Sequence, residues 1–103
     1  FQVLDSEDQL RLIKRSVAAL ELDHKQWPPR QARWFINKHK DEGLRAQHID
    51  HGGDVATRTW IKVYEHYQKA CDRGGLVDFA ELLLRAQELW RQHPDLLAHY
   101  RKR

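Results

Sequence analysis

Methionine is absent from this sequence, cysteine occurs once and proline occurs only three times. The single cysteine, Cys71, excludes a disulfide within the chain, so a reducing, cytoplasmic setting is the default expectation. No apolar run approaches the roughly 20 residues that a membrane-spanning helix needs, so contact with a membrane is not expected. Because the chain also begins without methionine, we expect it to be a piece of a longer protein.

Charge and aromatic rings are present in the proportions of an ordered, well-solvated domain. The chain has 103 residues, enough for one domain with one modest core but not for two. Its net charge of +3 is mildly basic. Such a charge permits contact with nucleic acid without demanding it.

Apolar residues recur at helical spacing along the chain, and no alternating pattern of strands competes with them. Residues 5–20, 30–43, 55–73 and 78–90 each carry such a stripe, and residues 93–103 predict a short fifth helix. The stripe of the fourth helix consists of Phe79, Leu82, Leu83, Ala86, Leu89 and Trp90. The sequence therefore predicts one all-α domain over residues 1–103, a small bundle of about five helices.

Asp78 begins the fourth helix and has two possible roles. As an N-cap it would accept a hydrogen bond from the helix start, with Glu81 completing a D-x-x-E capping box. Ser6 and Gln9 predict a similar box at the first helix. Acid–base chemistry would require a second polar group converging on a pocket, and none is near Asp78 in the sequence. A helix cap is the favoured interpretation.

Two other groups of residues are of the types found in metal and catalytic sites, but their surroundings in the sequence do not support such a site. His48 and His51 lie in a polar, glycine-bearing loop over residues 44–54, but structural zinc prefers four Cys or His ligands at fixed spacings. Cys71 lies on the apolar stripe of the third helix, where a free cysteine usually behaves as a small buried hydrophobe. A hydrolase that uses the histidine-rich loop is kept as a minor hypothesis. Neither a catalytic site nor a metal site is predicted.

A basic and aromatic signal remains on the second and third helices. Such side chains suit contact with phosphates and stacking on bases. Acidic neighbours interrupt the pattern, so an ordinary salt-bridged surface is equally compatible with it. The candidate residues are Arg30, Arg33, Trp34, Lys38 and Lys40 on the second helix and Arg58 and Lys62 on the third.

Three stretches resemble the UvrD family of bacterial superfamily 1 DNA helicases, whose members include Rep and PcrA. They are "DSEDQLRLIKR", "WPPRQARWFINKHKDEGLR" and residues 60–103, which begin "WIKVYEHYQKACDRGGLVDFAELL". The resemblance implies that this chain corresponds to subdomain 1B, an all-helical insertion in the first motor domain. The family's phosphate-binding loop lies upstream and its magnesium-binding D-E-x-Q-D strand lies downstream. ATP and Mg²⁺ would therefore belong to the parent helicase, and no cofactor to this piece.

The resemblance also implies a function and partners. The parent would hydrolyse ATP, move 3′ to 5′ along single-stranded DNA and unwind duplex during DNA repair. Subdomain 1B would help to position the single-strand–duplex junction and would contact motor subdomain 1A of the same chain. The "DFAELL" stretch matches a family motif beside the DNA path, which carries over Asp78, Phe79, Leu82 and Leu83 as candidate DNA-binding residues.

A different class of function also fits the sequence. The bundle would then be a protein-interaction module that docks repair partners or a second helicase copy, with an exposed Trp27 or Trp34 as its anchor. Self-association of the isolated piece is a further expectation, since separating it from 1A would uncover a packed surface.

Overall fold

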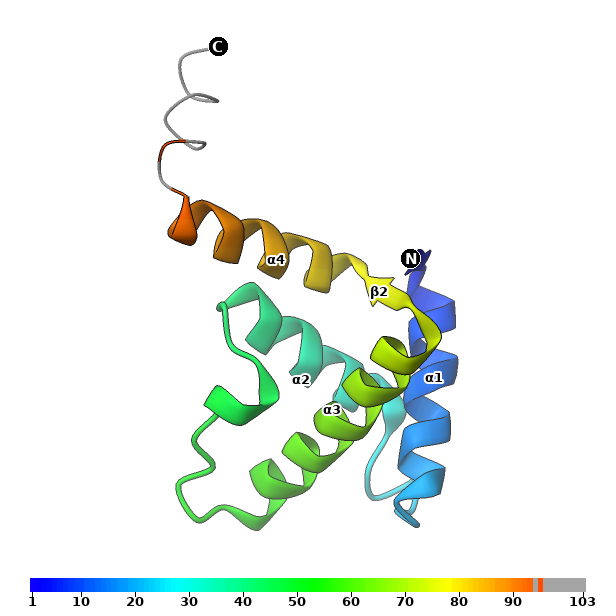
Figure 1. Ribbon diagram of the computed structural model, residues 1–103. Helices are drawn as coiled ribbons and strands as arrows, with labels where there is room; N and C mark the ends of the chain where they lie inside the picture. The colour runs from blue at the N-terminus through cyan, green and yellow to red at the C-terminus, as the bar shows by residue number, and fades with distance from the viewer. Residues whose placement is uncertain (94, 96–103) are drawn as a thin grey trace.

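Four α-helices and a short pair of strands form the part of the chain that the structure describes, residues 1–93 and 95 of a computed structural model (Figure 1). The elements are β1 (Gln2–Leu4), α1 (Ser6–Ala19), α2 (Pro29–Asp41), the 3₁₀ turn η1 (Ala46–His48), α3 (Val55–Gly74), β2 (Leu76–Asp78) and α4 (Phe79–Gln92). The four predicted helices are thus present within a few residues of their predicted ends. The predicted fifth helix, over residues 93–103, lies almost wholly outside the described residues.

The hydrophobic core lies between α1, α2 and α3. Most of its side chains come from the apolar stripes that helical spacing predicts. Full burial of one Val, Ile or Phe side chain stabilises a fold by about 1.5–3 kcal/mol. The buried set is Ile13, Val17, Ala32, Phe35, Ile36, Ala46, Ile61, Val63, Tyr64, Tyr67 and Cys71. No helix among the described residues is long and apolar enough to cross a membrane.

Carboxylates cap three of the four helices. Asp5, Asp54 and Asp78 each accept a hydrogen bond from the backbone N–H three residues on, at 2.7, 3.3 and 2.6 Å. The predicted box of Ser6 and Gln9 is therefore wrong, because Asp5, one residue earlier, is the cap. The Gln9 side chain instead turns inward and is 5% exposed.

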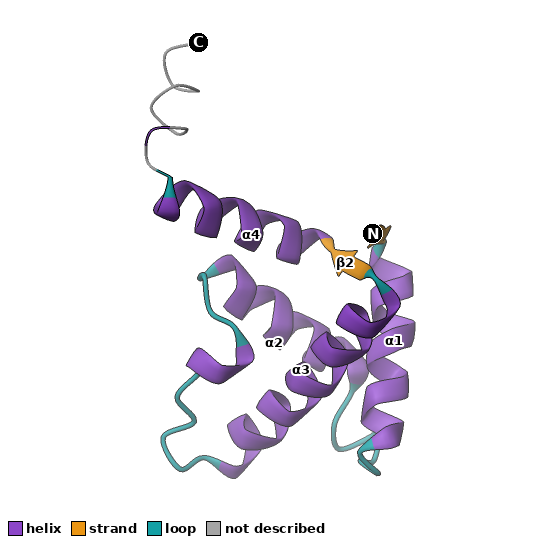
Figure 2. Cartoon of the chain, in the orientation of Figure 1, coloured by secondary structure: helices purple, strands orange, loops and turns teal. Residues whose placement is uncertain are grey.

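A two-stranded parallel sheet is the feature that the sequence did not predict (Figure 2). Gln2, Val3 and Leu4 of β1 pair with Leu76, Val77 and Asp78 of β2. Each strand has three residues, too few to show the alternation that identifies a strand in a sequence. The pairing joins the beginning of the chain to the start of α4, so that Asp78 lies beside the first turn of α1.

The orientation of α4 corrects the predicted apolar face. The helix packs against α2 (Figure 1), and the side chains that it buries are Ala80, Glu81 and Leu84. Most of the predicted face points outward instead: Phe79, Leu83, Leu89 and Trp90 are 67%, 46%, 47% and 38% exposed, while Leu82 and Ala86 are half-buried. A charged residue, Glu81, thus occupies a position that the pattern assigned to the surface.

Candidate nucleic-acid interface

One side of α2 faces solvent and carries an aromatic ring between two cations. Arg30, Trp34 and Lys38 follow at intervals of four residues, which aligns them along one face of the helix. The Trp34 indole is 64% exposed, and the Lys38 ammonium lies 5.0 Å from its ring centroid. This arrangement can stack on a base while the neighbouring cations meet phosphates.

Trp34 stands between two open grooves and forms a wall of both, together with Arg30 and Lys38. The groove toward α3 has a volume of about 760 Å³, and the groove on the other side about 640 Å³. Carboxylates also line the grooves: Asp50 and Asp54 the first, Asp41 and Glu42 the second. The positive charge of this region is therefore concentrated on α2 itself.

Arg33, the next predicted cation, joins this surface to α1. Its Nη1 donates to the hydroxyl and to the carbonyl oxygen of Ser6, at 2.9 and 3.2 Å. A guanidinium has five N–H donors, so these two bonds leave others to face a phosphate. Arg33 is half-buried and lies at the edge of the groove beside Trp34.

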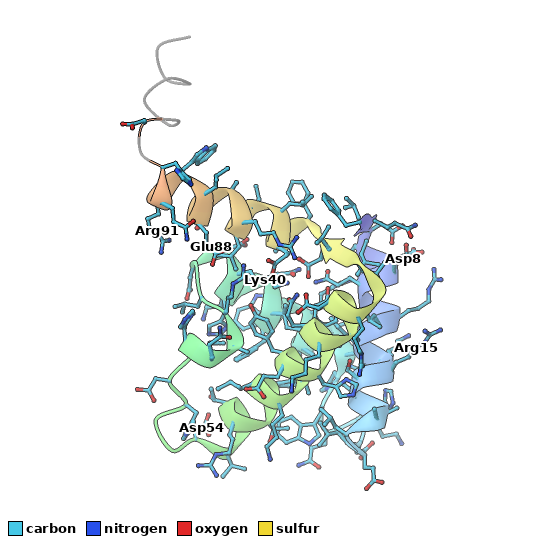
Figure 3. The ribbon with its side chains drawn as sticks, viewed as in Figure 1. Asp8, Arg15, Lys40, Asp54, Glu88 and Arg91 are labelled. Carbon is cyan, nitrogen blue, oxygen red and sulfur yellow. The ribbon has the colours of Figure 1, made fainter. Side chains whose placement is uncertain are left out.

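Lys40 does not fit the expectation that it contacts DNA. Its side chain is 1% exposed and points into the interior between α2, α3 and α4 (Figure 3). The ammonium lies 2.9 Å from Asp78 Oδ2 and 3.2 Å from Glu81 Oε1, and above the rings of Tyr64 and Tyr67. Its charge is committed to two buried carboxylates, so Lys40 has none to offer a phosphate.

Asp78 is a helix cap and also a junction between elements. Oδ1 caps α4, while Oδ2 accepts from Lys40, from the Tyr67 hydroxyl and, at 3.4 Å, from Gln9 Nε2. The predicted cap is confirmed, but the carboxylate also ties α4 to α1, α2 and α3. With 2% of its surface exposed it faces no ligand, so a direct contact between Asp78 and DNA is not supported.

Glu81 completes this buried network, which we define as Gln9, Lys40, Arg45, Tyr67, Asp78 and Glu81. Its carboxylate does not return to the Asp78 N–H as a capping box would; it binds Lys40, Arg45 and Arg85. Arg45 in turn donates to Glu88, at 2.6 Å from Nη2, on the side of α4 that faces α2 (Figure 3). Burial alone would raise the pKa of Glu81, but the hydrogen bond from Arg45 and the charges of Lys40 and Arg45 outweigh it and lower that pKa.

This lowered pKa predicts acid sensitivity. A carboxylate whose pKa is lower in the folded state contributes stability above its unfolded pKa, roughly 4.3 for glutamate, and loses it as the pH falls through the folded value. The free energy of unfolding of the chain is therefore expected to fall between about pH 5 and pH 3. In the Glu81→Gln variant, less stable at pH 7, the fall is expected to be smaller. Urea unfolding at several pH values gives the free energy of unfolding against pH for the unchanged chain and for the variant. An equal fall in the two proteins would contradict the role given to Glu81.

The remaining predicted residues lie apart from the α2 surface. Arg58 and Lys62 are exposed on α3, and neither lines the grooves beside Trp34. Phe79 and Leu83 are exposed on α4, where Leu82 is half-buried. The structure thus brings Arg30, Arg33, Trp34 and Lys38 together and separates the other candidates from them.

Helical spacing contained a signal that distinguishes Lys40 from Lys38. Lys40 follows Ile36 by four residues and Ala32 by eight, which places it on the buried face of α2. Spacing also places Tyr67 on the buried face of α3, but it does not say which polar groups meet there, because most partners of Gln9, Tyr67 and Glu81 are distant in the sequence. The hydrogen bonds between these residues are therefore a finding of the structure alone.

The histidine-rich loop and Cys71 have structural roles. In the loop, the Gly53 N–H donates to His51 Nδ1 and the Gly52 N–H to Asp50 Oδ1, both at 2.9 Å, so these side chains stabilise their own turn. Within residues 1–93 and 95, no three His, Cys, Asp or Glu side chains gather in a way that could hold a metal ion. Cys71 is 1% exposed, and burial raises the pKa of its thiol to about 11, which keeps it protonated at neutral pH.

The fold and this surface define a small helical module with a basic, aromatic face of the kind that suits nucleic acid. The chain belongs to the UvrD/REP helicase N-terminal domain family, whose family model matches residues 1–103. The resemblance that the sequence suggested is thereby confirmed.

Similarity to individual relatives extends along the whole chain. It is 66% identical over 103 residues to DNA helicase II of Escherichia coli and 55% identical over 103 residues to DNA helicase II of Haemophilus influenzae. It is also 32% identical over 103 residues to the ATP-dependent DNA helicase PcrA of Leuconostoc citreum, an alignment that includes 99% of this chain. The first two alignments include all of this chain, and in each case the chain spans 14% of the relative's length.

Proposed function

We propose that this chain is the DNA-contacting accessory subdomain, 1B, of an ATP-dependent DNA helicase that moves 3′ to 5′ and acts in DNA repair. Its role is to hold DNA at the single-strand–duplex junction while other parts of the parent do the chemistry. ATP and Mg²⁺ are bound by those parts, since this sequence contains no G-x-x-x-x-G-K-[ST] phosphate cradle. The names of the relatives, DNA helicase II and ATP-dependent DNA helicase PcrA, support this proposal.

The observation that carries the proposal is the outward face of α2. Arg30, Arg33 and Lys38 supply charge for phosphates, and the exposed Trp34 ring lies among them. Contacts with phosphates position a protein on DNA without reading its sequence, as expected for a motor that must act on any sequence.

Charge reversal tests the proposal against a matched control. The variant Arg30→Glu, Arg33→Glu, Lys38→Glu is expected to bind a fluorescent single-strand–duplex junction at least about tenfold more weakly than the unchanged chain at low salt. The control Lys25→Glu, Lys69→Glu, Arg73→Glu alters net charge equally at exposed positions elsewhere. Fluorescence anisotropy measures the three affinities. Equal losses of DNA affinity in the two variants would mean that net charge alone explains the effect, which would contradict a local interface on α2.

The outward apolar face of α4 favours a second candidate function, the docking of protein. Four large apolar side chains of α4 are exposed, Phe79, Leu83, Leu89 and Trp90, and exposed apolar patches often mark sites of protein interaction. Trp27, which the sequence offered as an anchor, is a poor one, because it is half-buried and packs edge-on against Trp60 at 5.1 Å. The occupants of this face would be motor subdomain 1A, a repair partner or a second copy of the chain.

The two candidate functions use different surfaces, so one pair of variants separates them. Replacing Phe79 and Leu83 by aspartate is expected to remove self-association or partner binding and to leave the affinity for DNA intact. The charge reversal on α2 is expected to have the opposite pattern of effects. A chain that loses DNA binding through the α4 substitutions would instead have its DNA interface on α4.

A further inference from the structure

A basic groove between α1 and α2 adjoins the proposed interface and has no assigned role. Its volume is about 320 Å³, and its lining residues are Glu7, Leu10, Arg11, Lys14, Arg30 and Arg33. Four of these six side chains are cations and one is a carboxylate. Arg11 lies 3.6 Å from Asp8, but the two side chains are 68% and 44% exposed, so this contact holds the guanidinium only weakly.

Charge distinguishes this groove from the two that flank Trp34. The groove toward α3 has two cations, Arg30 and Lys38, beside the carboxylates of Asp50 and Asp54. The groove on the other side of Trp34 sets three cations against two carboxylates. The groove between α1 and α2 therefore has the largest excess of positive charge, and a chain of phosphates is attracted to it most strongly.

The basic groove is continuous with the Trp34 ring. Arg30 and Arg33 line both grooves, the basic groove between α1 and α2 and the second groove beside Trp34. Along α2 the step from Arg30 to Trp34 is four residues, about 6 Å at the helical rise of 1.5 Å per residue. A backbone held in the groove thus has a base within reach of the ring.

The exposed Trp34 indole favours single-stranded DNA over duplex DNA as the ligand. In a duplex the faces of the bases are covered by their neighbours, whereas an unpaired base has a face free for stacking on an aromatic ring. The Lys38 ammonium lies over the Trp34 ring at 5.0 Å, a position from which it would also pair with a phosphate of the stacked nucleotide.

We propose that single-stranded DNA lies with its phosphates in the groove between α1 and α2, held by Arg11 and Lys14 together with Arg30 and Arg33, and stacks one base on Trp34. This inference rests on the proposed function and adds to it the path of the backbone, the ring on which a base stacks and two binding residues on α1. Arg11 and Lys14 position the backbone, and Trp34 discriminates single strand from duplex.

Two variants test the groove and the ring separately. The substitutions are Arg11→Gln with Lys14→Gln for the groove and Trp34→Leu for the ring, with Lys25→Gln and Lys69→Gln as the matched control. Anisotropy of a fluorescent oligothymidylate and of a blunt duplex, measured across salt concentrations, gives the affinities. All the substituted positions except Trp34 are exposed cations, and thermal unfolding checks that each variant folds.

Loss of the two groove cations is expected to reduce the slope of log affinity against log salt for the single strand by about 1.4, or 0.7 for each phosphate contact, with little change in the control. Trp34→Leu is expected to weaken single-strand binding by about 5- to 150-fold, the range of one base–aromatic stack, and to leave duplex binding unchanged. Quenching of tryptophan fluorescence by oligothymidylate is expected to diminish in the same variant.

The results that overturn the inference differ from those that overturn the proposed function. If Arg11→Gln with Lys14→Gln binds the single strand like the unchanged chain while the charge reversal on α2 abolishes binding, the groove assignment is wrong and the proposed function stands. If Trp34→Leu weakens single strand and duplex equally, the ring does not select unpaired bases. If the unchanged chain binds neither DNA at low salt, both are wrong.

Discussion

Lys40→Ala is expected to lower the free energy of unfolding by about 3–5 kcal/mol, a large part of the 5–15 kcal/mol that holds an ordinary domain together. The ammonium lies 2.9 Å from Asp78 and 3.2 Å from Glu81, and each of the three side chains is at most 2% exposed. Removing it leaves two buried carboxylates without the cation that they share. Urea unfolding followed by circular dichroism measures the change.

Two comparisons separate charge from packing at this position. Lys40→Met keeps most of the side-chain volume and removes the charge, so it is expected to remain strongly destabilising. Lys38→Ala, two residues earlier on the exposed face, is expected to change stability by no more than about 0.5 kcal/mol. If Lys40→Met were as stable as the unchanged chain, the buried network would not depend on the ammonium, and the burial of Lys40 would be a matter of packing alone.

Leu84→Ala is expected to cost about 2–5 kcal/mol, whereas Leu83→Ala is expected to cost about 0.5 kcal/mol or less. Leu84 is fully buried where α4 packs against α2, and truncating it leaves a cavity. Leu83, its neighbour in the sequence, is 46% exposed. Thermal or urea unfolding of the two variants compares them directly, and a larger effect at Leu83 would mean that α4 packs through the face that the sequence pattern predicted.

The core helices were predictable because local physics determines them. The stripes that include Ile13, Ile36 and Tyr67 have helical spacing, and Pro29 and Gly75 fit the positions at which α2 begins and α3 ends. Gly75 has a φ of +65°, which favours glycine after a helix. These features depend only on neighbours in the sequence.

The orientation of α4 was not predictable from the same kind of pattern. Its outward face is rich in Phe and Leu, while its inward face includes Glu81, which a pattern of polarity assigns to solvent. Burial of that carboxylate depends on Lys40 and Arg45, which lie about 40 residues earlier in the sequence, and on the β1–β2 pairing that sets the start of α4. Sequence periodicity contains no information on such distant charge partners.

The candidate site shows the same division. The cluster of Arg30, Arg33, Trp34 and Lys38 follows from helical spacing on α2 and was predicted. Arg11 and Lys14 were not, because only the packing of α1 beside α2 brings them to the same groove. The sequence of one helix predicts a basic patch on that helix. Only the fold shows that the patch extends from α2 to α1.

The most direct test of the account is the salt dependence of binding to a single-strand–duplex junction by the unchanged chain and by the Arg30→Glu, Arg33→Glu, Lys38→Glu variant. If these cations contact phosphates, log affinity falls linearly with log salt for the unchanged chain, and the slope of the variant is smaller by about 2 to 3, or 0.7–0.9 for each lost contact. Parallel lines for the two proteins, or no binding by the unchanged chain at low salt, would contradict a DNA interface on α2.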